Sequence, residues 1–324
     1  MGTVLVAGAT GFVGRHLVGA LREAGHTVVC GSRNPGRQVA REGVRWVRLD
    51  VDAPDTLGPA LEGCDAAVYL VHAMAEHDEP GPAERRAALA FRTACEHAGI
   101  RRIVFLGGPR PAGPPSAHLA SRLETGELLR SGSVSAIELR AAMIVGEGSE
   151  SWTICRDLAM RLPIMVLPSW LGTRSQPLWI GDVVRALVRA VDLPLEGSHA
   201  FDLPGPDTLS ARDILVRTAA IRGFRPIMIP VPILSPRLSS YWLHGVTRAD
   251  IRIARQLVEG LRHDMVSPDD GFWALAPDLE RTPFDEAARR ALASEAPMPS
   301  RRERLWERLT SAIAPSAGPV TVRT

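Results

Sequence analysis

Three glycines near the start of the chain have the spacing of an anion site. Gly8, Gly11 and Gly14 follow the apolar run VLVA and precede an amphipathic segment over residues 13–21. A strand, a glycine turn and a helix N-terminus in this order direct backbone N–H groups and the positive end of the helix dipole at one point. Gly8 permits a tight turn, Gly11 lets a diphosphate approach, and Gly14 lets the helix lie against the strand. The stretch therefore predicts a site for a dinucleotide diphosphate.

The next predicted strand ends in residues that would select between two cofactors. Residues 27–30 predict a strand that runs into Ser32 and Arg33. In dinucleotide-binding folds this strand end meets the adenosine ribose, where an Asp or Glu binds the free 2′-hydroxyl of NAD. No acidic residue stands there, and a planar guanidinium suits a 2′-phosphate. The pattern favours NADP(H) over NAD(H); the alternative is that Arg33 is a solvated loop residue.

Two more strand ends are expected beside the cofactor, because ligands bind outside the carboxyl ends of parallel strands. The residues concerned are Asp50 and Val51, suited to the adenine edge, and Val71, His72 and Ala73 on the next strand end. The loop that follows is rich in His, Asp and Glu, which raises the question of a metal. No ligand spacing such as HExxH occurs, so we predict a solvated loop and no metal site.

The elements that would position these residues alternate regularly. Strands are predicted over residues 4–7, 27–30, 44–49, 66–71, 103–106 and 135–139, and helices over 13–21, 55–61, 83–98 and 118–131. Repeated strand–helix alternation predicts an α/β fold, a Rossmann-type doubly wound parallel sheet.

Beyond Gly148 the alternation stops. Helices are expected over residues 152–162, 183–191, 210–221 and 238–261, and strands over 176–180, 199–203 and 227–231, with Asp182 and Ser210 as helix N-caps. We predict a dinucleotide-binding core over residues 1–150, to which 176–203 contribute. A smaller, mostly helical substrate lobe covers 151–311, and a tail over 312–324 is expected to be disordered.

Composition excludes several kinds of function. The 324 residues are 45% hydrophobic and 23% charged, as in ordinary globular proteins, and the net charge of +2 gives no reason to expect nucleic acid or a membrane as partner. Apolar runs are short and broken by proline, and the first strand leaves no room for a signal peptide. Scattered cysteines without a CxxC pair fit the cytoplasm. Every basic residue is arginine, so Schiff-base and lysine-base chemistry are excluded.

The chain resembles the short-chain dehydrogenase/reductase superfamily, and within it the atypical, NmrA-like branch. The resemblance rests on the GATGFVG turn, Arg33, Asp50 and the strand end YLVHAM, and it continues through LETGELL, LRAAMIVG and TRSQPLWIGDV to about residue 265. It implies that the cofactor is bound by Gly8, Thr10, Gly11, Phe12, Val13, Gly14, Ser32, Arg33, Asp50, Val51, Val71, His72, Ala73, Gly107 and Ala142.

The chain departs from the superfamily in its catalytic residues. Active members use a Tyr-x-x-x-Lys pair, and here the same place holds His118 and Arg122, four residues apart on one helix face. Arg122 would hold the ribose hydroxyls, and His118 would donate a proton because imidazole titrates near neutral pH. Ser116 is a third, weaker candidate. The alternatives are that His118 is solvated or caps the helix, that Arg122 only pairs with Glu124 or Glu127, and that Ser116 is a cap.

The other aromatic residues are expected to pack. Tyr69 is assigned to the core and Tyr241 to the lobe, while one or two of Trp152, Trp170, Trp179 and Trp242 are candidates to line an apolar substrate pocket.

These features predict an NADP(H)-dependent oxidoreductase that acts on a small, fairly apolar carbonyl or related substrate. Hydride transfer is expected beside Gly107, Gly108 and residues 141–143. Two alternatives stay open. One is a protein that binds NADP(H) without turnover, as a redox sensor, regulator or assembly partner. The other is a non-redox isomerase on the same scaffold. Both a monomer and a homodimer are compatible with the sequence.

Overall fold

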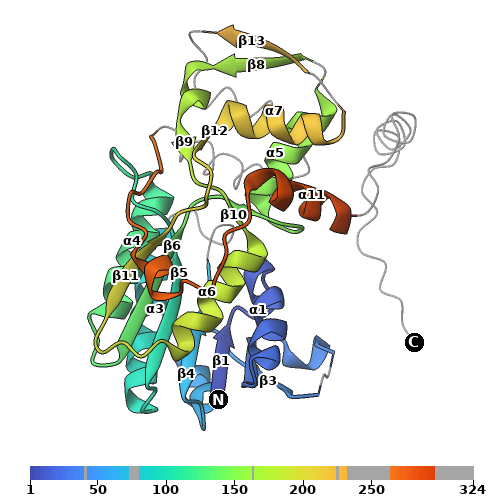
Figure 1. The fold of residues 1–324 in the computed structure, drawn as a ribbon. Coiled ribbons are helices and arrows are strands. Elements are labelled where there is room, and N and C mark those ends of the chain that lie inside the picture. The colour runs from blue at the N-terminus through green and yellow to red at the C-terminus, as the bar shows by residue number, and fades with distance from the viewer. Residues whose placement is uncertain (40–41, 73–79, 163, 224–225, 232–262, 296–324) are drawn as a thin grey trace, which may run out of the picture.

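The computed structural model describes residues 1–39, 42–72, 80–162, 164–223, 226–231 and 263–295. A sheet of seven parallel strands in the order β11-β6-β5-β4-β1-β2-β3 forms the centre of this part of the chain (Figure 1). Its strands are β1 (Thr3–Ala7), β2 (Thr27–Ser32), β3 (Val44–Arg48), β4 (Ala66–Tyr69), β5 (Arg102–Gly107), β6 (Ser135–Ala141) and β11 (His199–Leu203). The predicted doubly wound α/β fold is confirmed.

Helices cover both faces of the sheet, and the side chains of β1 show why. Val4 and Val6 pack into one core, and Leu5 and Ala7 into the other, because successive strand residues point to opposite faces. The helices on the first face are α1 (Phe12–Glu23), α6 (Ile180–Asp192) and α10 (Gly271–Leu275); those on the second are α2 (Leu57–Leu61), α3 (Pro80–His97) and α4 (Ala117–Arg130). Burial on both faces explains why the strands are nearly continuous apolar runs.

The strand order reverses between β1 and β4. The chain builds β1, β2 and β3 outward in one direction and then returns to place β4 on the other side of β1. The connections after β1 and β4 therefore diverge, which opens a crevice outside the carboxyl ends of these strands. Such a switch point is where open α/β sheets bind their ligands.

A second group of elements stands above the sheet in Figure 1. Its own small cores hold buried residues such as Trp152, Ile214, Leu215 and Phe284. The elements are α5 (Glu150–Arg161), β8 (Ile164–Pro168), α7 (Ala211–Ile221), β13 (Ile227–Val231) and α11 (Phe284–Ser294), with the short pieces β7 (Ile144–Val145), η3 (Ser169–Gly172), β9 (Arg174–Ser175), β10 (Leu178–Trp179) and β12 (Leu209–Ser210). We refer to this group as the lobe. The 3₁₀ turns η1 (Pro35–Arg37) and η2 (Pro54–Thr56) belong to the core.

Segments late in the chain return to the core. Residues 176–203 include α6 and the edge strand β11, and α10 adds Phe272 and Trp273 to the same core. The predicted helix over 238–261 and the tail over 312–324 lie outside the described residues. The division at residues 150 and 151 stays a prediction, since the chain passes between core and lobe more than once.

Of the two residues predicted to be helix N-caps, the structure confirms one and contradicts the other. Ser210 caps α7, as expected. It also forms a capping box with Asp213. Asp182 is not an N-cap, because α6 begins at Ile180 and Asp182 lies buried in its first turn. Its carboxylate accepts hydrogen bonds from the backbone N–H (2.7 Å) and the hydroxyl (3.0 Å) of Thr282. A tertiary contact 100 residues away decides its role, and no local pattern shows it.

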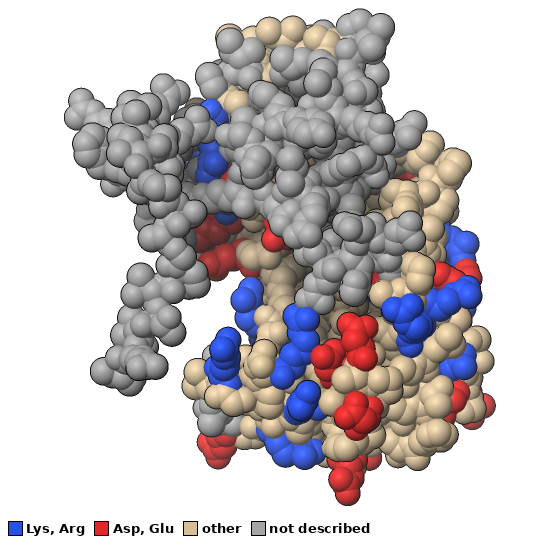
Figure 2. Space-filling model, turned by 180° about the vertical axis from the view of Figure 1, so that it is seen from behind, with Lys and Arg blue, Asp and Glu red and all other residues tan. Residues whose placement is uncertain are grey.

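None of the described helices is long and apolar enough to span a membrane. On the face drawn in Figure 2, arginine side chains and acidic side chains lie interspersed over the core. This mixing of signs agrees with a net charge of +2.

Candidate active site

A cleft of about 620 Å³ lies at the carboxyl edge of the sheet, between the core and the lobe. It brings together residues that are far apart in the sequence. Among its lining residues are fourteen of the fifteen predicted to bind the cofactor: Gly8, Thr10, Gly11, Phe12, Val13, Gly14, Ser32, Arg33, Asp50, Val51, Val71, His72, Gly107 and Ala142. The fifteenth, Ala73, lies outside the described residues. Ser116, His118 and Arg122 also line the cleft. The structure thus places these residues in one cavity, and their roles stay predictions.

The glycine turn is shaped for a bulky anion. Gly8 has a φ of +90°, which a side chain would strain, and its carbonyl oxygen accepts the N–H of Gly11 at 3.0 Å. A Cβ on Gly14 would overlap the carbonyl oxygen of Gly8 and lie 2.8 Å from the Cα of Ala9. Helix α1 begins here with no side-chain cap from the described residues and no acidic residue in its first turn. The unsatisfied N–H groups and positive helix end therefore fit a diphosphate.

The end of β2 carries the predicted selectivity residues. Arg33 is exposed and lines the cleft, next to Ser32, whose hydroxyl accepts the N–H of Asn34 at 3.2 Å. On the neighbouring strand end, the carboxylate of Asp50 accepts the N–H of Asp52 at 3.1 Å. A guanidinium at the end of β2 fits a 2′-phosphate better than a free 2′-hydroxyl.

Helix α4 begins at the cleft wall. The hydroxyl of Ser116 accepts the N–H of Leu119 at 3.3 Å, so the expected capping role of Ser116 is confirmed. The guanidinium of Arg122 donates to the carbonyl oxygens of Val71 (3.2 Å) and Leu106, and it lies 4.6 Å from the ring centre of Phe105. Arg122 thus ties together the chain segments that follow β4 and end β5.

The alternative prediction that Arg122 only pairs with Glu124 or Glu127 is wrong. Glu124 pairs with Arg85 and Glu127 pairs with Arg110, so neither carboxylate is the partner of Arg122. Its partners are backbone carbonyls of two strands, which helical spacing alone does not reveal.

His118 lies in the cleft wall, and it is neither solvated nor a helix cap. Its ring stacks on that of His72, with ring centres 4.6 Å apart, and its Nδ1 atom is buried with no hydrogen-bond partner among the described residues. Burial, with His72 and Arg122 nearby, lowers the pKa of His118 to about 3. The expectation that this imidazole titrates near neutral pH is therefore wrong, because burial outweighs its intrinsic chemistry. A neutral ring still offers one N–H donor.

A buried carboxylate beside His72 was missed by sequence reasoning. The Nδ1 atom of His72 is 3.1 Å from an Oε atom of Glu84, and the other Oε atom accepts the hydroxyl of Ser121. Burial alone would raise the pKa of Glu84, but the hydrogen bonds from His72 and Ser121 and the charge of Arg122 lower it to about 2. Glu84 precedes two arginines in a helical stretch, so nothing local distinguishes it from a solvated residue.

The lobe lines the same cleft with apolar residues and with the polar residues Ser149, Glu150, Ser151 and Ser175. The side chains of α5, α7 and the segment after residue 263 that line the cleft include Ile154, Cys155, Ala211, Ile214 and Met265. Trp152 and Trp179 pack in a hydrophobic core and do not line the cleft, which agrees with the expectation that most of the four tryptophans are core residues. Tyr241 and Trp242 lie outside the described part of the structure, as does the side chain of Trp170. Tyr69 is buried in the core, as expected.

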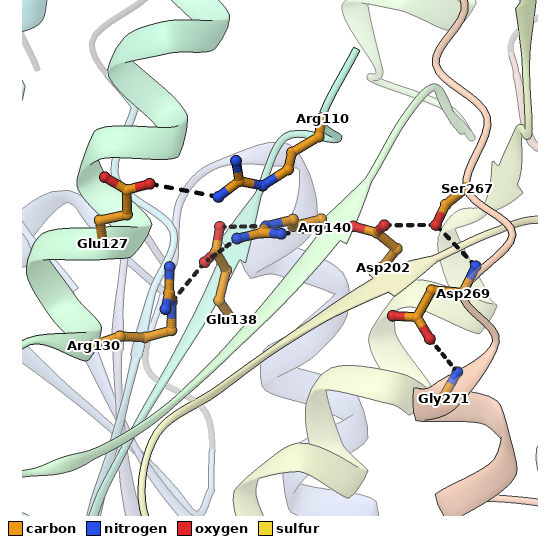
Figure 3. A network of polar contacts seen from close by, with 9 residues as sticks. All are labelled: Arg110, Glu127, Arg130, Glu138, Arg140, Asp202, Ser267, Asp269 and Gly271. Atoms are coloured by element: carbon orange, nitrogen blue, oxygen red, sulfur yellow. Dashed lines mark hydrogen bonds and ion pairs between the residues drawn. The ribbon is translucent and has the colours of Figure 1, made fainter. Parts of the chain in front are cut away.

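A network of polar contacts joins α4, β6, β11 and the segment after residue 263 (Figure 3). Glu138 on β6 pairs with Arg130 on α4 at 2.9 Å and with Arg140 at 3.0 Å. Asp202 on β11 accepts the hydroxyl of Ser267 at 2.6 Å, two residues after the cleft residue Met265. Because removing one partner of a buried ion pair is strongly destabilising, this network fixes the relative positions of these elements.

The described residues contain no group of three or more His, Cys, Asp or Glu side chains that could hold a metal ion. The loop over residues 73–79, where the sequence raised that question, lies outside the description.

Comparisons with known proteins agree with the geometry of the cleft. Residues 8–157 match the family model described as NAD(P)H-binding. The chain is 28% identical over 282 residues to a 3-diazoavenalumate denitrifying reductase from a Streptomyces species, covering 76% of this chain and 90% of that protein. It is 26% identical over 235 residues to a ceramide reductase from Caulobacter vibrioides, covering 71% and 74%.

The chain also resembles solved structures in its fold. A nucleoside-diphosphate-sugar epimerase from Staphylococcus aureus superposes with a TM-score of 0.70 at 16% identity, covering 89% of this chain and 99% of that one. At this identity the match shows the fold alone. The family match confirms the NAD(P)-binding domain that the resemblance implied, and the relatives are reductases. Residues 8–157 form an NAD(P)H-binding domain, and the chain as a whole is similar to reductases.

Proposed function

We propose that this protein is an NADP(H)-dependent reductase of small, fairly apolar carbonyl or related compounds. One observation carries the proposal. The glycine-lined start of α1, the guanidinium of Arg33, two histidines and apolar residues of the lobe all line a single cleft. The reductase relatives support the same reaction type.

The residues that would hold the cofactor are those of the cleft's core side. Gly8, Gly11 and Gly14 would receive the diphosphate and Arg33 the 2′-phosphate, which is what makes the proposal specific for NADP(H). Asp50 and Val51 would face the adenine, and the stretch from Val71 would face the ribose. When bound, the reduced cofactor supplies a hydride for transfer to the substrate.

His118 would act on the substrate oxygen as a neutral hydrogen-bond donor. Its low pKa keeps the ring uncharged at neutral pH, so an N–H group, not an imidazolium, polarises the carbonyl. Arg122 would act as a positioning residue, because its guanidinium holds the strand ends on either side of the site. Ser116 would set the start of α4 and hence the place of His118 two residues later.

The lobe wall favours substrates with apolar bodies. Ile154 and Ile214 are buried and line the cleft, so an apolar part of a substrate would contact them. The substrate's carbonyl would then lie toward the histidines and its apolar part toward the lobe.

A second candidate is a protein that binds NADP(H) without turnover. The observation that favours it is the lack of a Tyr-x-x-x-Lys pair, since the chain contains no lysine. The same experiment separates the two functions.

The test is to measure NADPH and NADH binding by fluorescence and then NADPH oxidation across a panel of apolar aldehydes and ketones. The proposal expects tighter binding of NADPH and turnover of at least one panel member. His118→Ala should lower kcat by about 10²–10³-fold, the usual effect of losing a donor to a developing oxyanion, with little change in NADPH affinity. Binding without turnover of any panel member would favour the non-catalytic function. Equal binding of both cofactors would contradict the NADP(H) assignment.

A further inference from the structure

The strand end after β4 carries a buried histidine–carboxylate pair that faces the cleft. His72 lines the cavity, and Glu84 lies behind it on α3 with an exposed fraction of only 7%. Both carboxylate oxygens have partners, one at His72 Nδ1 and one at the hydroxyl of Ser121 on α4. Two helices thus hold a fixed negative charge against Nδ1 of a histidine that lines the cleft.

We propose that the His72–Glu84 pair is the proton-transfer unit of this enzyme, with His72 Nε2 exchanging the proton of the substrate oxygen. The inference rests on the proposed reductase function and deepens it. It assigns the acid–base role to His72 and leaves His118 as a neutral hydrogen-bond donor.

The charge of Glu84 decides which ring nitrogen carries the proton. An ionised carboxylate is only an acceptor, so His72 must direct an N–H from Nδ1 toward it. The neutral ring then has its lone pair on Nε2, which accepts no hydrogen bond from the described residues. A carboxylate that fixes the tautomer and orientation of an imidazole in this way is the arrangement that makes histidine an effective base.

The step balances in both directions. A substrate alcohol loses the proton of its O–H group to His72 Nε2 and the hydride of its C–H bond to the oxidised cofactor, which leaves a carbonyl. The imidazolium formed beside Glu84 then releases the proton to solvent. In carbonyl reduction the imidazolium donates that proton to the oxygen as the carbon receives the hydride.

The groups around His72 act in opposite directions on its charge. Burial and the guanidinium of Arg122 disfavour the imidazolium, while the hydrogen bond and charge of Glu84 favour it, and the net effect is a pKa below the ordinary value of 6.5. His118, stacked on the same ring, is neutral at neutral pH. Reduction should therefore slow as the pH rises above the pKa of His72, because the protonated fraction falls.

A nearby ion pair provides a matched control. Arg85 and Glu124 also bridge α3 and α4, but both are partly exposed and neither lines the cleft. Glu124→Gln removes a carboxylate between the same two helices without touching the proposed proton path.

The first test needs no substrate. NMR of the full-length protein with ¹⁵N- and ¹³C-labelled histidine should show the Nδ1–H tautomer for His72 and a titration below pH 6.5, which Glu84→Gln shifts to lower pH. Glu124→Gln should leave that titration unchanged. An Nε2–H tautomer, or a titration that does not respond to Glu84→Gln, would overturn the proposal.

The second test is kinetic. Glu84→Gln should lower the rate of carbonyl reduction at pH 7 by about tenfold or more and move the alkaline limb of the pH profile to lower pH, with NADPH affinity within about twofold of wild type. His72→Asn should lose about 10²-fold or more in kcat and abolish that limb. Thermal melting of both variants checks that they fold. If the wild-type enzyme reduces a carbonyl but Glu84→Gln leaves the pH profile of the rate unchanged, the role of the His72–Glu84 pair is contradicted and the proposed function is not. A wild-type protein that binds NADPH but reduces no carbonyl contradicts the proposed function itself.

Discussion

The two ends of the cleft are built in different ways. The end proposed for the adenosine and diphosphate uses two short stretches, Gly8–Gly14 and Ser32–Arg33, and depends chiefly on backbone groups. The end proposed for the reaction uses side chains from a strand end, α3 and α4, namely His72, Glu84, His118, Ser121 and Arg122. Backbone groups keep the same hydrogen-bonding chemistry wherever they are placed. The charge of an ionisable side chain, in contrast, depends on its surroundings.

The difference appears most clearly in the charges. Burial and its neighbours lower the pKa of His118 to about 3, and hydrogen bonds lower that of Glu84 to about 2. The same two residues in a solvated helix would be an ordinary histidine and glutamate. The diphosphate end can therefore be tested through shape, and the reacting end through charge and pH.

The largest effect is expected from a single methyl group at the diphosphate end. Gly14→Ala forces its Cβ into the backbone of Gly8 and Ala9, which should separate α1 from β1. Overpacking of this kind costs about 1–3 kcal/mol, so NADPH affinity should fall by about 10–100-fold. Gly19→Ala in the same helix is the control, because its Cβ would meet nothing within 4 Å. Calorimetric titration measures both, and equal affinities for the two variants would refute the role of the turn.

An effect of similar size, but limited to one cofactor, is expected at the end of β2. Arg33→Ala should weaken NADPH binding by about 10–100-fold, since hydrogen bonds to charged groups contribute about 1.5–3 kcal/mol. NADH binding should change little, because NADH has no 2′-phosphate. Arg37→Ala is the matched control, as Arg37 is an exposed arginine of η1 that does not line the cleft. If Arg33→Ala weakens both cofactors equally, the guanidinium does not discriminate between them.

The smallest effect is expected in acid stability at the reacting end. His118 stays neutral in the folded protein down to a pKa of about 3, whereas the unfolded chain takes up its proton near pH 6.5. The unfolded state thus binds more protons between these values, and wild-type stability falls as the pH drops from about 6.5 toward 3.

His118→Gln should reduce this loss. The fall in Tm between pH 7 and pH 5 should be smaller than in wild type by ~2–4 °C, as expected for the loss of about 2 kcal/mol of stability in a chain of this size. His16→Gln, at an exposed histidine on α1, is the control. An unchanged pH dependence in His118→Gln would show that the ring is not buried as described, which would remove the contrast between the two ends.

Much of the architecture was predictable because its signals are local. Strand–helix alternation predicted the parallel sheet, and Ser210 as an N-cap predicted the start of α7. The same local rule predicted Asp182 as a cap, and this prediction is wrong. Its carboxylate instead accepts hydrogen bonds from Thr282, which lies in a distant segment of the chain. Local patterns thus succeed where the partner of a polar group lies within one helical turn and fail where it comes from elsewhere.

By itself, the sequence determined a doubly wound sheet, a glycine turn shaped for a diphosphate and the absence of lysine chemistry. Only the tertiary structure decided that Arg122 binds the carbonyls of two strand ends, that His118 is neutral, and that Glu84 lies behind His72. The physical reason is that backbone geometry follows from residue type and spacing over a few positions. The charge and hydrogen bonding of a buried side chain depend on which distant groups packing brings against it.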